Sequence, residues 1–278
     1  MFPPSLPVII FGVIAETSIN KLFVAGLIPG MLLIFLLSIY SVFVGVKSDV
    51  VRERISLKQI VVATWHAKWE LFIPVIVAVG IYGGYVTLGE MATLIVVYAL
   101  IIEMAIHREI TLRHLPLIMN QSMVLVGGIL IILGSALALT NYMIDDQIPM
   151  VILDAMQDLF TSRWVFLIGL NVFLLIVGCL MDIYSALLVV VPLILPIAVS
   201  YGVDPIHLGI IFLTNLEIGY STPPVGMNLF ISCFRFKRTV IALYSASLPF
   251  LVVLLFALML ITYIPQLSLL LVTALGIN

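Results

Sequence analysis

The sequence predicts an all-α integral membrane protein built on an inverted repeat, with helices that are interrupted inside the membrane. Three observations lead to this fold class. Hydrophobic residues make up 63% of the 278 residues and charged residues only 9%, and the mean hydropathy is +1.31, which soluble domains do not reach. Two Pro-Pro pairs lie within apolar sequence. Basic residues follow these two pairs in opposite patterns.

Long apolar runs recur along the whole chain, as in LFVAGLIPGMLLIFLLSIYSVFVGV at 22–46 and LVVLLFALMLITYI at 251–264. A helix needs roughly 20 apolar residues to cross the hydrocarbon layer. Strands of a membrane barrel would alternate polar and apolar residues, and these runs do not. The spans are therefore predicted to be helices in contact with a lipid bilayer. The formal net charge of -2 does not favour a nucleic-acid partner.

The prolines indicate an internal repeat, which is sought before a fold is named. Shifting the chain by 220 residues (223 − 3, 224 − 4, 249 − 29) places three prolines on three others. The matched pairs are Pro3 with Pro223, Pro4 with Pro224, and Pro29 with Pro249. Each copy is then a broken segment followed by a long span.

The charges after the two broken segments are reversed. In the first copy AETSINK holds one basic residue, whereas the loop after the next span holds five, which are Lys47, Arg52, Arg54, Lys58 and Lys68. In the second copy RFKR at 235–238 follows the broken segment directly, and nothing basic follows the last span. Because cytoplasmic loops collect Lys and Arg, the copies should cross the membrane in opposite senses. Such repeats with matching breaks are typical of secondary transporters, with substrate and ion sites at the breaks.

The middle of the chain is predicted from its patterns. Residues 55–70 form an amphipathic, basic segment with two tryptophans, which suits a helix at the cytoplasmic surface. Residues 71–87 and 91–106 read as a helical pair that turns at TLGE, and Glu90 is expected to cap the second helix.

The next part of the chain leads back to the second repeat. Residues 122–139 are predicted to cross outward, and the acidic loop 141–160, without Lys or Arg, is expected to be periplasmic. From Arg163 to RFKR the charges require an odd number of crossings. Which of these pieces are re-entrant stays open.

Three polar residues in apolar surroundings are candidates for function. Asp182 follows a long apolar run, and a carboxylate in such a place usually pairs, coordinates an ion or carries a proton; the alternative is an interfacial position. Glu217 lies one turn before the second break and is either a site residue or an interfacial acid. His207 is expected to be a surface or capping histidine rather than a proton relay.

The segment GYSTPPVG, 219–226, carries the strongest prediction of a site. Breaking a helix in hydrocarbon frees backbone carbonyls, whose desolvation is costly unless a neighbour or an ion satisfies them. We expect Gly219 to let a carbonyl turn inward, Thr222 to add a hydroxyl, and the prolines to keep the helix from reclosing. Such hard oxygen ligands suit Na⁺. The alternative is a proline kink compensated by neighbouring helices.

Several motifs resemble the large membrane subunit of the tripartite ATP-independent periplasmic (TRAP) transporters. They are FPPSLPVIIFG, LFVAGLIPG, GIYGGYVTLGEMATLIVVYAL and the block from GCLMDIYS to STPPVGMNLF. The resemblance covers essentially the whole chain. It implies an elevator-type, sodium-driven importer of organic acids such as C4-dicarboxylates or sialic acid. It also implies a small membrane subunit and a periplasmic solute-binding protein as partners, in the bacterial inner membrane.

The resemblance further implies the site residues. One sodium would lie between the second, re-entrant hairpin and the broken helix, at Gly178, Asp182, Gly219, Thr222 and Val225. A second sodium would lie at the first break, at Pro3, with Ser5 and Asp182 toward the substrate. No catalytic residues and no organic cofactor are expected.

The chain departs from the family pattern in three ways. TLGE stands where the family usually has Thr-Pro-Thr-Glu, and Ser221 stands where an apolar residue is common. The family's amino-terminal helices and first hairpin have no counterpart, so we expect a fragment rather than a split chain. We also expect this chain alone to insert but not to transport.

The predicted organisation follows from these parts. The segments are a transport-domain remnant at 1–20, a span with a surface helix at 21–69, scaffold spans with the acidic loop at 70–176, the second hairpin and broken helix of the transport domain at 177–237, and a final span at 238–278. Two alternatives remain. An intramembrane aspartyl protease needs two carboxylates sharing a proton, and no second aspartate lies within another apolar run. A channel would show flux that neither saturates nor requires a sodium gradient.

Overall fold

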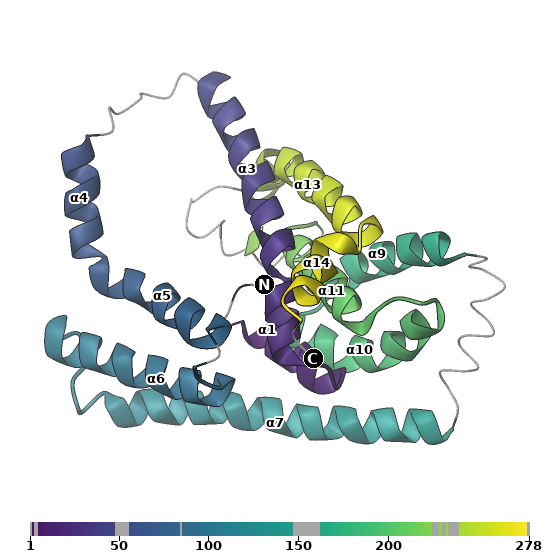
Figure 1. Ribbon diagram of the computed structural model, residues 1–278, viewed down its shortest axis with the longest axis horizontal. Helices are drawn as coiled ribbons and strands as arrows, with labels where there is room; N and C mark the ends of the chain where they lie inside the picture. Colours follow the sequence, from purple (N-terminus) through teal and green to yellow (C-terminus); the bar gives the residue numbers. More distant parts are fainter. Residues whose placement is uncertain are drawn as a thin grey trace. The chain divides into compact units, whose positions relative to one another are not determined.

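The computed structural model describes residues 2, 5–47, 56–83, 85–146, 162–223, 228–229, 232 and 239–276. Every regular element in these ranges is helical, which confirms the predicted all-α class. The helices, drawn in Figure 1, are α1 (Leu6–Ile14), α2 (Ile19–Ala25), α3 (Leu27–Lys47), α4 (Leu57–His66), α5 (Lys68–Tyr82), α6 (Leu88–Ile101), the π-helical turn η1 (Ile102–Ile106), α7 (Leu115–Asp145), α9 (Arg163–Leu180), α10 (Ile183–Ser200), α11 (Pro205–Gly219), α13 (Val240–Tyr263) and α14 (Gln266–Ala274).

Membrane-length helices are the main feature of the described residues. Five segments are long and apolar enough to cross a bilayer, which are Ile19–Lys47, Gly89–Ile106, Arg163–Leu180, Ile183–Ser200 and Ile241–Tyr263. On α3, Phe35 and Val42 are 62% and 65% exposed. Large apolar side chains without protein neighbours suit a surface covered by lipid. The protein is therefore a multi-pass membrane protein.

The chain divides into two compact units. The first holds residues 1–48 and 132–278, and the second holds residues 49–131. Both Pro-Pro segments belong to the first unit, so the predicted site residues all lie there.

In the second unit, α4 and α5 replace the single surface helix expected at 55–70. The helix turns by 70° around Ala67, so that Lys68 already begins α5. α5 and α6 pack as the predicted pair, and the Tyr98 hydroxyl donates to the Trp69 carbonyl at 2.9 Å. The expected capping role of Glu90 is confirmed, because its carboxylate accepts from the Thr87 amide at 2.8 Å. TLGE is therefore the start of α6, and the turn itself lies just before it.

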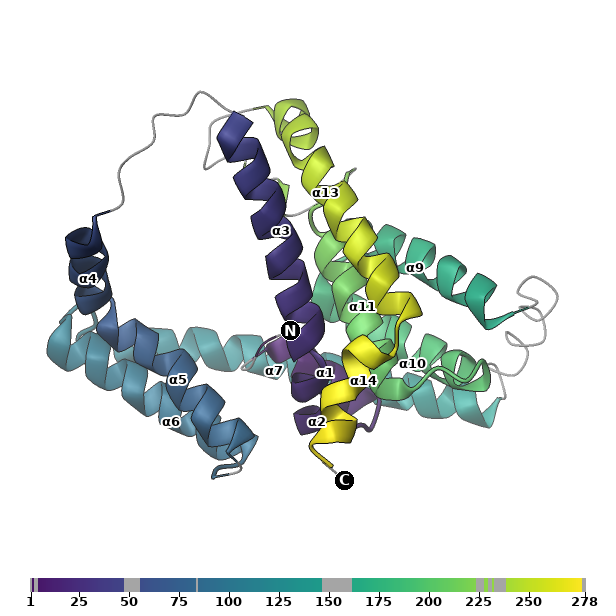
Figure 2. The ribbon, with the colours of Figure 1, turned by 45° about the horizontal axis from the view of Figure 1, so that its top comes forward.

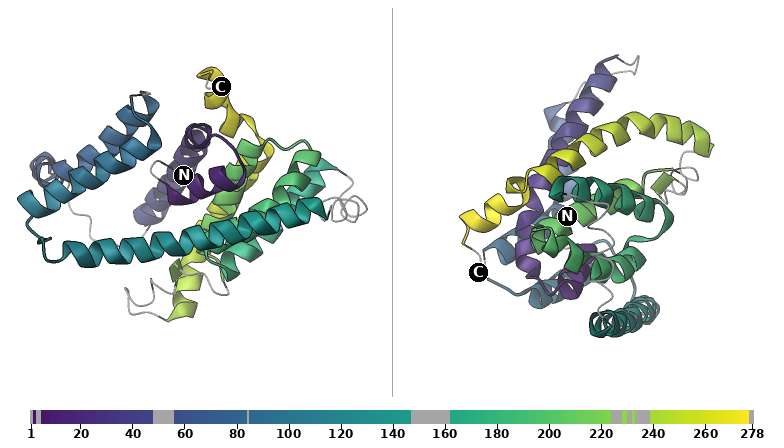
Figure 3. Two further views of the ribbon diagram at one scale, coloured as in Figure 1. Left: turned by 90° about the horizontal axis from the view of Figure 1, so that it is seen from below. Right: turned by 90° about the vertical axis from the view of Figure 1, so that its right-hand side faces the viewer.

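In the first unit, α11 is the central helix. It packs against α1, α2, α9, α10, α13 and α14 (Figures 2 and 3). Its side chains are buried from His207 to Leu216 without interruption. A helix that is apolar all round belongs in a protein interior, which is why its companion helices take the lipid-facing positions.

α3 and α13 are the two long spans that the proline offset matches. They lie side by side, with the rings of Tyr40 and Phe250 packed edge to face at 4.9 Å. They run in opposite directions, as Figure 2 shows. Each follows a proline-containing segment and a short helix or helical residues, which are α1 in the first copy and Asn228 and Leu229 in the second. The two spans are therefore antiparallel, and the inverted repeat itself stays a prediction.

Candidate functional site

The ends of α9 and α11 meet backbone to backbone at two glycines. A Cβ atom on Gly219 would lie 2.7 Å from both Cα and the carbonyl carbon of Gly178, and 3.0 Å from the Cys179 nitrogen. Conversely, a Cβ atom on Gly178 would lie 3.1 Å from Cα of Leu216. Both positions therefore require glycine for packing. The contact also brings together two residues that the sequence analysis assigned to one sodium site.

Because both helices end at this contact, α9 and α11 present the same pole to it. The last carbonyls of a helix lack partners within the helix and carry the negative end of its dipole. The carbonyls of Gly178, Cys179 and Leu180 accept no hydrogen bond from the described residues. At the end of α11, the carbonyls of Ile218 and Gly219 accept hydrogen bonds from Ser221 and Thr222. The carbonyls of α9, next to the negative pole of α11, form surroundings that favour a cation.

Asp182 caps the next helix of the hairpin. Its carboxylate accepts from the amides of Tyr184 and Ser185, both at 3.0 Å, and from the Ser185 hydroxyl. Aspartate is among the preferred residues at a helix N-cap, so the sequence around 182–185 folds into α10 for local reasons. Asp182 lies close to Gly178 in the chain, and its assignment to sodium and substrate stays a prediction.

Tyr220 connects the hairpin to the break, and sequence reasoning missed it. Its phenol oxygen accepts a hydrogen bond from the Ile183 amide at 2.7 Å. Ile183 is the first residue of α10, whose amide has no partner within the helix. The only sequence signal was a hydroxyl-bearing aromatic directly after Gly219 at the break.

Thr222 closes the last turn before the prolines. Its hydroxyl donates to the Ile218 carbonyl at 2.7 Å, and its amide donates to the Gly219 carbonyl at 2.9 Å. The hydroxyl oxygen keeps its lone pairs for another partner. The inward-turned Gly219 carbonyl stays a prediction, whereas the contact with Gly178 is a reason for glycine that the sequence did not reveal.

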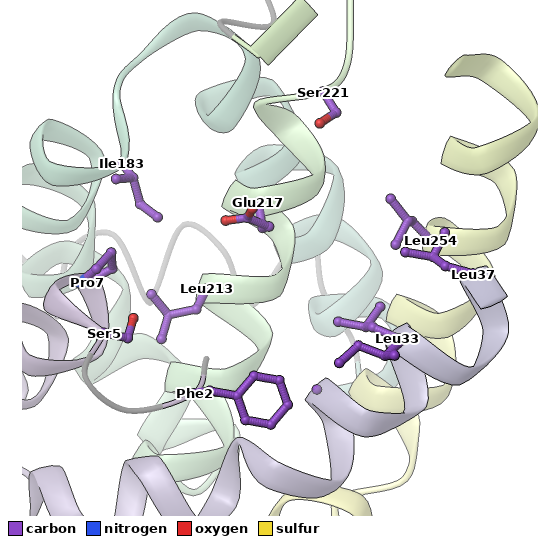
Figure 4. Close-up of a pocket in the computed structure, with 12 residues that line it drawn as sticks. Phe2, Ser5, Pro7, Leu33, Leu37, Ile183, Leu213, Glu217, Ser221 and Leu254 are labelled. Atoms are coloured by element: carbon purple, nitrogen blue, oxygen red, sulfur yellow. The ribbon is translucent and has the colours of Figure 1, made fainter. Parts of the chain in front are cut away.

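A cavity of about 400 Å³ lies beside this junction, between α1, α3, α10, α11 and α13 (Figure 4). Most of its walls are apolar, and its polar side chains are Ser5, Glu217 and Ser221. Ser5 precedes α1 and makes no capping hydrogen bond with its side chain. The structure thus places the predicted substrate residue Ser5 in a cavity with the second break. Asp182 is not among the lining residues, although Ile183 is.

Two predicted site residues, Pro3 and Val225, lie outside the described residues. Of the remaining five, the structure brings Gly178 into contact with Gly219 and sets Ser5 in the cavity. Asp182 and Thr222 follow these two glycines in the chain by four and three residues. Within the described part of the chain, no three His, Cys, Asp or Glu side chains group as metal ligands. The oxygen atoms that could bind a cation at this junction belong to backbone carbonyls and to hydroxyl groups.

His207 corrects an expectation from the sequence. It was expected at the surface or as a cap, but it is 0% exposed. Its ring nitrogens lie 3.2 Å from the Ser268 hydroxyl and 3.2 Å from the Thr262 carbonyl. The cap is supplied by Asp204, whose carboxylate accepts from the Ile206 amide at 2.8 Å. The histidine is buried because α11 is surrounded on all sides.

A buried amide pair, also missed by sequence reasoning, fixes α9 to α11. Asn215 donates to the Asn171 side-chain oxygen at 2.7 Å and to the Ile211 carbonyl at 2.8 Å. Asn171 in turn donates to the Thr262 hydroxyl of α13 at 3.1 Å. All three side chains are fully buried. Asn215 lies one turn before Gly219, so this network joins α9 and α11 close to the glycine contact.

The chain is similar in sequence to a known family and to several of its members. Residues 1–267 match the family described as tripartite ATP-independent periplasmic transporter, DctM component. The chain is 38% identical over 95% of its length to the isethionate TRAP transporter permease protein DctMQ of Oleidesulfovibrio alaskensis. It is 36% identical over 100% of its length to the C4-dicarboxylate TRAP transporter large permease protein DctM of Pseudomonas aeruginosa. It is 30% identical over 98% of its length to the sialic acid TRAP transporter large permease protein SiaM of Vibrio cholerae.

The alignments cover only part of each relative. The chain spans 42%, 65% and 64% of the lengths of these three proteins. The family is one of transporter permeases, so it supports the predicted transporter class over an intramembrane protease. With a match across residues 1–267 and these relatives over nearly its whole length, the chain belongs to the DctM family of TRAP transporter large permeases.

Proposed function

We propose that the chain is part of the membrane subunit of a sodium-coupled secondary importer of small organic acids. The observation that carries this proposal is the contact of Gly178 with Gly219, which places the carbonyl ends of α9 and α11 together. Half-helix ends and unwound backbone are the usual ligands of coupling cations in secondary transporters. Family membership supplies the transport class.

The coupled ion would be held by oxygen atoms at this junction. Backbone carbonyls around Gly178 and Gly219 and the Thr222 hydroxyl provide hard ligands, and Asp182 adds negative charge close by. Val225 completes this proposed set, and a second sodium would lie at the first break, near Pro3. The carbonyl and hydroxyl ligands are neutral, and the Asp182 carboxylate also caps α10. Such a site suits a monovalent cation, which must be released again during transport.

The substrate would occupy the cavity beside the junction. Ser5 offers a hydroxyl that no capping bond uses, at the amino-terminal end of α1, where the helix dipole favours an anion. Apolar walls from Phe2, Leu33 and Leu213 leave room for a small carbon skeleton. The relatives are named for isethionate, C4-dicarboxylates, ectoine and sialic acid. We therefore propose a small carboxylate or a similar organic acid.

The partners follow from the family. We propose that the chain works with a small membrane subunit and with a periplasmic solute-binding protein that delivers the substrate, in the bacterial inner membrane. The moving part would be an elevator domain that includes the hairpin of α9 and α10 and the broken helix α11. Substrate choice would rest largely with the binding protein.

The test is uptake of labelled organic acid by proteoliposomes that contain the complete transporter with its loaded binding protein. We expect saturable uptake that requires an inward sodium gradient and stops when choline replaces sodium. Uptake of the same size without sodium would overturn the sodium coupling. Flux that rises linearly with substrate concentration would favour the channel alternative.

A further inference from the structure

Tyr220 joins three segments of the chain at the end of α11. Its phenol oxygen accepts a hydrogen bond from the Ile183 amide at 2.7 Å. Its backbone carbonyl accepts one at 3.2 Å from the amide of Asn228, which lies beyond the two prolines. Its own amide donates to the Leu216 carbonyl at 2.9 Å and continues the helix. One residue thus connects α11, the start of α10 and the chain after the break.

The first turn of α10 depends on this hydroxyl. A helix starts with amides that have no partner inside the helix. Asp182 satisfies the amides of Tyr184 and Ser185 with its side chain and that of Ala186 with its carbonyl. The Ile183 amide remains, and Tyr220 accepts from it. Closure of the hairpin tip onto α11 is therefore complete only while the tyrosine oxygen is in place.

This hydrogen bond lies at the wall of the cavity. Ile183 lines the cavity together with Glu217 and Ser221, which are close neighbours of Tyr220 in α11 and the break (Figure 4). Movement of the α10 start away from Tyr220 would therefore widen the cavity at this wall. The hydrogen bond between Ile183 and Tyr220 therefore lies where the hairpin would have to separate from the broken helix to open the cavity.

We propose that the Tyr220 hydroxyl is a latch that holds the start of α10 closed on the helix break, and so couples the break to access to the cavity. The inference rests on the proposed function, because the sodium site is the reason for the break to change. Tyr220 directly precedes Ser221 and Thr222, so rotation of this last turn withdraws the phenol oxygen from Ile183. Sodium at the ends of α9 and α11 keeps the turn in place and the latch closed. Tyr220 is thus a positioning residue that acts through α10.

Two substitutions remove the latch from opposite sides. Tyr220→Phe deletes only the oxygen. Ile183→Pro deletes the amide donor and also replaces one side chain of the cavity wall, and proline is well tolerated at the first helical position. The residue before a proline must be extended, and Asp182 already has φ -71° and ψ 155°. Tyr98→Phe is the matched control, because it removes a tyrosine hydrogen bond to the Trp69 carbonyl in the other unit.

The readout is the rate at which a maleimide labels a cysteine at Met181→Cys in the full-length transporter with its partner subunits. Met181 precedes Asp182 at the hairpin tip and is 37% exposed. We expect sodium to slow labelling in the parent protein and in Tyr98→Phe. Tyr220→Phe and Ile183→Pro should each speed labelling in sodium by about three- to tenfold, the loss of one hydrogen bond. The double variant should be no faster than either single variant.

Uptake provides the second measurement. Tyr220→Phe should raise the half-saturating sodium concentration by a similar factor, since sodium must then also hold a less stable closed tip. A labelling rate that Tyr220→Phe leaves unchanged would overturn the latch, whatever drives transport. Additive effects in the double variant would also overturn it. Parent uptake that needs no sodium would instead contradict the proposed function, and the labelling rates would still decide whether Tyr220 holds the tip.

Discussion

Gly178 and Gly219 lie in direct backbone contact, although 41 residues (219 − 178) separate them. Gly219→Ala would set a methyl group 2.7 Å from two backbone atoms of Gly178. Backbone cannot yield as a side chain does, so α9 must move away from α11. We expect a loss of about 1–3 kcal/mol of stability, as for other overpacked sites, and loss of sodium-dependent uptake.

Thermal unfolding in detergent measures the loss of stability. Gly128→Ala, where no atom lies within 4 Å, is the control; an equal shift in both variants would contradict the contact.

Thr222→Val tests the hydroxyl at the break while keeping the side-chain shape. The loss of one ligand, roughly 1 to 3 kcal/mol for an unsatisfied partner, should raise the half-saturating sodium concentration by about ten- to a hundredfold. The measurement is uptake against sodium concentration in the complete transporter. Thr222→Ser, which keeps the oxygen, should stay near the parent value. If valine left both the midpoint and the steepness unchanged, the threonine would serve only the kink through its bond to the Ile218 carbonyl.

Asp182 has a structural role and a proposed electrostatic one, and two substitutions separate them. Asp182→Asn keeps a side-chain acceptor for the amides of Tyr184 and Ser185, whereas Asp182→Ala removes it. Alanine should therefore cost about 0.5–2 kcal/mol of stability and asparagine much less. We expect both variants to weaken sodium dependence, because both remove the charge. Normal sodium dependence in a well-folded Asp182→Asn protein would reduce the carboxylate to a helix cap.

Asn171→Leu tests the buried amide network. The substitution deprives Asn215 of its 2.7 Å acceptor and Thr262 of its 3.1 Å donor. Two buried polar groups then each lose one partner, and we expect destabilisation of about 1–3 kcal/mol. Asn215→Leu in the same background should recover part of this loss, because it removes an amide that keeps only its bond to the Ile211 carbonyl. Chemical or thermal unfolding of the four variants forms a cycle, and simple additivity would show that the two amides do not act together.

The charge pattern predicts a topology that labelling can check. Cysteines at Gln59→Cys on α4 and at Thr273→Cys on α14 should react differently with an impermeant maleimide in intact cells. We expect the first to be protected as cytoplasmic and the second to be labelled as periplasmic. A permeant reagent must label both. Labelling of Gln59→Cys by the impermeant reagent would remove the basis of the inverted repeat.

The sequence predicted the spans well because hydrocarbon imposes a length and a polarity on each of them. It also predicted the cap by Glu90, since Thr87 and Glu90 are only three residues apart. The sequence did not predict the burial of His207, because this burial depends on the six other helices that pack around α11. The pairing of Asn171 with Asn215, and of Tyr220 with Ile183, depends in the same way on which helices pack together. Local patterns contain no information on such contacts.

The parallel ends of α9 and α11 also suggest an order of events. The negative poles of two helices lie beside each other at the Gly178 and Gly219 contact, and like poles repel. The sodium proposed for this junction would relieve this repulsion before any organic acid is present. An anionic substrate that came first would add its charge to two negative helix poles and to the carboxylates of Asp182 and Glu217. Loading should therefore be sequential, ion before anion, so that organic acid does not cross the membrane without its sodium.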